Sequence, residues 1–181
     1  MVACANSPKQ PAIVIDKKDS TLIPVLSSDE KNRYAEAIEY FKSKDYPSAA
    51  KIFNELTQKY PRLAGAYVNL GLIDEAQGDT DSALGRYKVA LNINPNNISA
   101  LIQRAKINQV QGQFLEAETD LIRAHTIDEK NTIVNYNLGL LYEKYLQNFD
   151  LAIEHYEAYV ESSKADDVRI VKRWIQLLER K

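Results

Sequence analysis

Apolar residues return every three or four positions along most of this chain, from Ser28 almost to its end. That spacing places them on one face of an α-helix. Short turn-forming stretches interrupt the pattern at regular intervals, so the sequence predicts pairs of helices joined by tight turns. The predicted helices run over residues 28–43, 46–60, 62–77, 80–93, 98–111, 114–127, 132–146, 149–162 and 164–179.

The helix pairs repeat with a constant period. Small residues occupy one position on each first helix, at Ala37, Gly71, Ala105 and Gly139, in steps of 34. Small residues also mark each second helix, at Ala49, Ala83, Ala117 and Ala152, and an aromatic or apolar residue follows, at Phe53, Tyr87, Leu121 and Tyr156. Paired helices approach to about 8–10 Å only where the facing residues are small. We therefore expect leucine at Gly71 or Ala83 to overpack the pair, by ~1–3 kcal/mol or more.

This pattern resembles the tetratricopeptide-repeat family over about residues 30–164. The resemblance implies an all-α solenoid of four helix–turn–helix repeats plus a C-terminal capping helix. The repeats would occupy residues 29–163, divided at about 30–63, 64–97, 98–131 and 132–163, with the cap at 164–181 and an extended tether at 1–28. Ala152 comes one position later than the period would place it after Ala117, so we expect one inserted residue, in the turn at 146–149.

Two helix ends carry further signals. Ser27 and Glu30 have the spacing of a capping box at a helix start. In the last helix, Val168, Val171 and Ile175 begin an apolar stripe, with charged residues on the other side, as a terminal cap requires. The apolar stretch 22–26 either docks on the first helix or forms a short strand; the residues leave both open.

Composition narrows the function. The net charge of −2 and the pI near 5.8 argue against a nucleic-acid partner. A single cysteine excludes an intrachain disulfide. No apolar run reaches the ~18 residues of a membrane span, so no transmembrane helix is predicted and a membrane would be reached only through a lipid anchor.

The string Met1-Val2-Ala3-Cys4 resembles the lipobox of bacterial lipoproteins. That resemblance implies that Cys4 is acylated, and Ala5 after it implies transfer to the outer membrane. Met1 stands where leucine is usual, and no charged and apolar signal regions precede it in this sequence. The alternative is an incidental cysteine in the N-terminal segment, which would leave a soluble cytoplasmic protein.

In the tetratricopeptide family, the first helix of each repeat lines a concave groove. Registration against the repeat places eight residues in that groove: Tyr34, Ile38, Val68, Leu72, Ile102, Lys106, Tyr136 and Leu140. Between them, Asn69, Gln103 and Asn137 form a row of amides at steps of 34, and amides can pair with the backbone of an extended peptide. The alternative is that these amides bond to adjacent helices or water. Tyr34 and Ile38 replace the lysine and asparagine of carboxylate-binding grooves, so a C-terminal carboxylate ligand is not predicted.

No catalytic group, metal site or cofactor is predicted. His125 and His155 stand in different repeats, without a second ligand at metal spacing, which favours a structural or surface role. Glu116, Glu118 and Asp120 read as a solvated helix face.

We therefore expect a non-catalytic adaptor that binds an extended peptide or partner protein in its groove. The lipobox favours a lipid-anchored protein of the bacterial periplasm that assists assembly of an envelope complex, such as a pilus or secretion system. The alternatives are the cytoplasmic scaffold and, more remotely, an accessory subunit of an enzyme.

Overall fold

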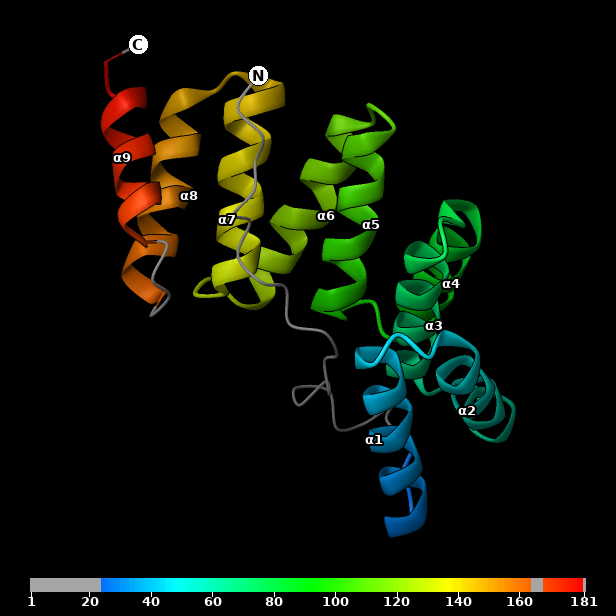
Figure 1. The fold of residues 1–181 in the computed structure, drawn as a ribbon. Coiled ribbons are helices and arrows are strands. Elements are labelled where there is room, and N and C mark those ends of the chain that lie inside the picture. Colours follow the sequence, from blue (N-terminus) through cyan, green and yellow to red (C-terminus); the bar gives the residue numbers. More distant parts are fainter. Residues whose placement is uncertain (1–23, 164–167, 181) are drawn as a thin grey trace. The chain divides into compact units, whose positions relative to one another are not determined.

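The computed structural model describes residues 24–163 and 168–180, and within them every regular element is a helix (Figure 1). The elements are α1 Ser28–Lys42, α2 Tyr46–Lys59, α3 Ala64–Ala76, α4 Thr80–Ile93, α5 Ile98–Val110, α6 Phe114–Ile127, α7 Thr132–Leu141, the π-helical turn η1 Tyr142–Leu146, α8 Phe149–Ser162 and α9 Val168–Leu178. The all-α prediction is confirmed, and the bounds of α4, α6 and α8 are those expected from the sequence. Cys4 and most of the expected tether lie outside the described residues, as do residues 164–167 at the start of the expected cap.

The chain divides into two compact units, and the boundary falls inside α5, between Ile107 and Asn108. In the first unit, α1 packs against α2, α2 against α3, and α3 against α4. In the second unit, α6 packs against α7, α7 against α8, and α8 against α9. Within each unit these helices thus pack on their neighbours in sequence, which is the arrangement that stacked helix pairs require.

A glycine lets a tyrosine ring lie directly on the backbone of α3. A Cβ added at Gly71 would stand 2.5 Å from Cε1 of Tyr87, closer than real side chains approach. Tyr87 is fully buried, and its hydroxyl donates a hydrogen bond of 2.5 Å to the Glu75 carboxylate, one turn along α3. Burial is the main reason that the pKa of Tyr87 is raised, so the hydroxyl stays a donor to Glu75.

The second unit repeats the same arrangement between α7 and α8. A Cβ at Gly139 would stand 2.5 Å from Cδ1 of Tyr156, whose hydroxyl donates to Glu143 at 2.8 Å. The first repeat has no such tyrosine, and there the position holds Ala37, which packs in one core cluster with Phe53. The small position therefore holds glycine where a tyrosine of the second helix lies over it, and alanine where a phenylalanine takes that place.

Glu30 ties the start of α1 to the end of α2. The predicted capping box is confirmed, because Ser27 accepts from the Glu30 amide and the Glu30 carboxylate accepts from the Ser27 amide. The same buried carboxylate meets Lys59 Nζ at 2.5 Å and accepts a hydrogen bond from the hydroxyl of Tyr60. Lys59 is the largest cause lowering the pKa of Glu30 to about 2, followed by Tyr60. In front of the box, Leu26 packs against the core of this helix pair, whereas Val25 is exposed.

The inserted residue of the fourth repeat is absorbed earlier than expected. The sequence placed it in the turn at 146–149, but the helix widens already at η1, where the backbone N–H of Asn148 reaches back to the carbonyl of Tyr142 at 3.0 Å. Gln147 then takes a left-handed conformation, with φ 52°, which ends the turn. A π-helical turn accommodates an extra residue without rotating the faces of the flanking helices.

The closing helix α9 buries its apolar stripe as predicted. Val171, Ile175 and Leu178 are buried. The Trp174 ring lies 6.4 Å from that of Tyr136 and 5.9 Å from that of Tyr156, so α9 covers the aromatic cluster of the last repeat.

Replacing Gly71 by alanine should destabilise the protein, because the new methyl group meets ring atoms of Tyr87 that are fully buried. We expect a loss of about 1–3 kcal/mol in the free energy of unfolding, the usual cost of overpacking. Urea denaturation measures this loss.

The matched control is the same substitution in a Tyr87→Leu background, which copies the Ala105 and Leu121 combination of the third repeat. There Gly71→Ala should be neutral or favourable, since alanine has the higher helix propensity. Equal losses in both backgrounds would show that the ring contact does not require the glycine.

Candidate functional site

In the first unit, a row of partly exposed side chains runs along the first helix of each repeat. Ile38 on α1, Leu72 on α3 and Lys106 on α5 stand at steps of 34 and are all partly exposed. The neighbouring groove candidates Tyr34, Val68 and Ile102 are buried and belong to the core. In the second unit, Leu140 on α7 is partly exposed, and Tyr136 is buried among the rings of Tyr156, Tyr159 and Trp174.

The three amides between these positions are buried and bonded within the chain. Asn69 is 2% exposed, and its Nδ2 donates to the hydroxyl of Tyr34 on α1 at 2.6 Å. Gln103 Oε1 accepts from Lys106 Nζ at 3.3 Å, and Asn137 Nδ2 donates to the carbonyl of Ile133 at 2.7 Å. The bond of Asn69 to α1 is the pairing with an adjacent helix that the sequence left open, whereas Gln103 and Asn137 bond within their own helices. Peptide binding by the amides stays a prediction, and it would require these bonds to be exchanged.

Lys106 is the charged member of the accessible row. Burial lowers its pKa to about 8, and the negative charge of Glu75 on α3 acts in the opposite direction. Burial likewise raises the pKa of Glu75, which receives the hydrogen bond from Tyr87. A partly desolvated ammonium group with one neutral hydrogen-bond partner attracts an anionic group of a ligand.

Sequence reasoning missed Glu75 as the neighbour of Lys106. A signal was present, since Glu75 stands one helical turn after Gly71, as Glu143 does after Gly139. Each of these glutamates faces a tyrosine of the second helix in the same repeat.

The two histidines come together in the second unit, although they belong to different repeats. The rings of His125 on α6 and His155 on α8 lie 5.2 Å apart, edge to face. His155 is buried, stacks on Tyr142 at 5.7 Å, and has Nδ1 3.3 Å from the Asn135 side-chain oxygen. Burial lowers the pKa of His155, the charge of His125 adds to this, and Glu154 opposes it.

The acidic face predicted on α6 is partly wrong. Glu116 is exposed, but Asp120 is buried and Glu118 accepts a hydrogen bond of 2.7 Å from the hydroxyl of Tyr142. The hydrogen bond from Tyr142 explains the difference for Glu118, because it shows that the next repeat packs on this side of α6.

Residues 24–163 and 168–180 contain neither a metal site nor a membrane span. No three acidic, histidine or cysteine side chains there are grouped so that they could hold a metal ion. No helix in this part of the chain is long and apolar enough to cross a membrane.

Comparison with known proteins identifies the repeat. Two family profiles, both described as tetratricopeptide repeat, match residues 31–98 and 133–166. A DnaJ homolog subfamily C member 7 homolog of Dictyostelium discoideum is 29% identical over 153 residues, which is 78% of this chain and 27% of that protein. The mitochondrial import receptor subunit TOM70 of Saccharomyces cerevisiae is 28% identical over 66% of this chain and 20% of its own length. The chain thus spans about a quarter or less of these two relatives.

Solved structures share the fold at lower identity. A tetratricopeptide repeat protein from Parabacteroides merdae superposes with a TM-score of 0.68 at 23% identity, covering 84% of this chain and 61% of that one. A thermophilic tetratricopeptide protein of Thermus thermophilus gives 0.68 at 22% identity, covering 83% and 82%. The structure of MamA gives 0.66 at 19% identity, covering 80% and 82%.

Acid should destabilise the second unit through His155. Its pKa is lowered in the folded chain, so the unfolded chain binds the proton first as the pH falls. The contribution of neutral His155 is therefore complete above about pH 6.5, the ordinary value for histidine, and is lost as the pH falls through the lower folded value. A series of urea unfolding curves from pH 7.5 downward measures the dependence.

His155→Gln should flatten this part of the pH dependence, because glutamine carries no proton that titrates. His125→Gln should flatten it less, since it removes only the neighbouring charge. Parallel curves for the wild type and His155→Gln would contradict this origin of the acid sensitivity.

Proposed function

This chain is a tetratricopeptide-repeat protein, and from that premise we propose that it is a scaffold whose first helices hold an extended peptide or a segment of a partner protein. Proteins of this family and fold are typically non-catalytic scaffolds. The observation that carries the proposal is the row of Ile38, Leu72 and Lys106, whose partly exposed side chains recur once per repeat.

The chemistry of the row specifies the ligand. Ile38 and Leu72 offer apolar surface, which favours aliphatic or aromatic side chains of the bound segment. Lys106 offers a cation whose pKa is lowered by burial, so an anionic ligand group restores part of the lost solvation. The bound segment therefore carries apolar side chains toward α1 and α3 and an acidic side chain toward α5.

The relatives support a role in handling other polypeptides. One is a subunit of a mitochondrial import receptor, and another is a DnaJ homolog. The chain matches only a part of each, so the shared property is the repeat, and the ligand of this chain is inferred from its own row.

For its location we propose a lipid anchor at Cys4 that holds the scaffold in the bacterial periplasm, at the outer membrane. The string Val2-Ala3-Cys4-Ala5 supports the anchor. A scaffold held there would assist assembly of an envelope complex, such as a pilus or secretion system, by presenting its partner close to the membrane. Without acylation of Cys4, the proposal reduces to a soluble scaffold.

Cross-linking tests the row. A photoreactive phenylalanine analogue placed at Ile38 or at Leu72 should capture the same partner in cells of the native host, and the same analogue at Lys88 on α4 should not. Capture from Lys88 alone, or from all three positions alike, would place the partner on the second helices and contradict the proposal.

The charge of Lys106 has a matched control. Lys106→Met should weaken binding of the captured partner by roughly two- to fivefold, as expected for one partly exposed ion pair, and added salt should lessen the difference. Lys88→Met removes an exposed lysine from α4 and should leave the affinity unchanged. Isothermal titration with the purified partner measures both.

The anchor is tested by mass. Protein purified from membranes of the native host should be heavier than the polypeptide by the mass of its acyl groups, and Cys4→Ser should abolish both the extra mass and the membrane association. Wild-type protein of unmodified mass in the soluble fraction would exclude the anchor and leave the scaffold function untouched.

A further inference from the structure

The fourth repeat departs from the others at one end of α7. One extra residue has been absorbed in the π-helical turn η1, and Gln147 follows in a left-handed conformation that is uncommon for residues other than glycine. π-helical turns within α-helices are found frequently at functional sites.

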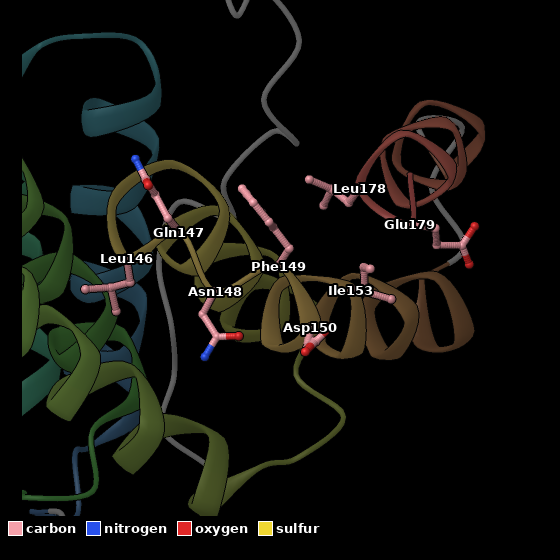
Figure 2. Close-up of a pocket in the computed structure, with 8 residues that line it drawn as sticks. All are labelled: Leu146, Gln147, Asn148, Phe149, Asp150, Ile153, Leu178 and Glu179. Carbon is pink, nitrogen blue, oxygen red and sulfur yellow. The ribbon is translucent and has the colours of Figure 1, made fainter. Parts of the chain in front are cut away.

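The turn forms one wall of a pocket of about 540 Å³, whose other wall is α9 (Figure 2). Its apolar lining comes from Leu146 of η1, Phe149 and Ile153 of α8, and Leu178 of α9. In Figure 2 Leu178 lies on the side of α9 nearer to α8, and Phe149 and Ile153 extend from the upper side of α8. The volume lies within the range of sites that bind small ligands or single large side chains, about 300–1,000 Å³.

The two charged side chains that line the pocket are both negative. Asp150 and Glu179 are among the residues that line it, and the rest of the lining carries no cation. Glu179 follows directly after the last residue of α9, where the carbonyl end of the helix already carries partial negative charge. Asp150 stands in the first turn of α8, where the helix N-terminus stabilises it, so Glu179 is the less compensated of the two.

We propose that this pocket binds a lysine or arginine side chain of a partner polypeptide. The aliphatic part of such a side chain would lie on Phe149, Ile153 and Leu178, and its cationic end would face Glu179 and the carbonyl end of α9. Long cationic side chains combine an apolar stem with a charged tip, which matches a pocket lined by both apolar side chains and carboxylates. A purely apolar ligand would bring no positive charge to the carboxylates, and an acidic ligand would be repelled by two like charges.

The site is separate from the row proposed above. All its residues belong to the second unit, whereas Ile38, Leu72 and Lys106 belong to the first. The two sites also favour opposite charges, because the row presents Lys106 and the pocket presents Glu179. Binding at the pocket therefore does not depend on the scaffold function proposed for the row.

The test uses three peptides that differ at one position. The full chain, labelled with ¹⁵N, is titrated with acetyl-Ala-Leu-Lys-Leu-Ala-amide and with peptides in which norleucine or glutamate replaces the lysine. The lysine peptide should shift amide resonances in residues 146–153 and 175–179. Its affinity should exceed that of the norleucine peptide by roughly two- to fivefold, the range of one exposed ion pair, and the glutamate peptide should bind weakest.

Variants identify the carboxylate. Glu179→Gln should reduce the affinity for the lysine peptide to that for the norleucine peptide, whereas Glu157→Gln, an exposed position on α8 outside the pocket, should change nothing. Equal binding of lysine and norleucine peptides, preference for glutamate, or no shift in residues 146–153 and 175–179 would each overturn the proposal. Shifts confined to α1, α3 and α5 would also overturn it, while supporting the row as a peptide site.

Discussion

The contact between a tyrosine ring and a bare helix backbone governs the packing of this protein. At Gly71 and Gly139 the missing Cβ leaves room for Tyr87 and Tyr156, and each hydroxyl then reaches a glutamate one turn further along the same helix as the glycine. The glycine, the tyrosine and the glutamate depend on one another. The ring fits only over glycine, and the partly buried carboxylate needs the tyrosine hydroxyl as a hydrogen-bond donor. Helix pairs packed in this way bury one side of each first helix and leave a narrow strip of the other accessible.

The accessible strip of the first helices is the surface that a partner can contact. Within the first unit, the core takes up Tyr34, Val68 and Ile102, and internal hydrogen bonds take up Asn69 and Gln103. The remaining row is short, mostly apolar, and ends in one cation. Since its side chains stand on helices held by buried rings, little conformational entropy is lost when a segment binds there, and modest contacts can suffice for specific recognition. The π-helical turn and α9 add a surface of opposite charge in the second unit.

The repeat period was enough to predict the helices, the capping box and the closing helix, because each depends on residues close in sequence. It also located the first-helix positions, but it could not separate buried from accessible members of that face. Asn69 illustrates why: its bond to Tyr34 joins one repeat to the next, so it depends on how successive first helices meet. The same holds for Glu118, whose partner Tyr142 belongs to the next repeat, and for His125 and His155, whose contact crosses from α6 to α8. The inserted residue was recognised from the spacing, yet its place was missed because a π-helical turn has no local signal in the residues.

Glu30 has a mechanical consequence. Its carboxylate accepts a hydrogen bond from the backbone N–H of Ser27, at the start of α1. The same carboxylate also binds Lys59 and Tyr60, at the end of α2. Tension applied through the chain ahead of Pro24 therefore reaches α1 and α2 together. To pull α1 away from α2, a force must break the contacts of Glu30 with Lys59 and Tyr60 as well as the capping box. The start of α1 and the end of α2 therefore resist extension together.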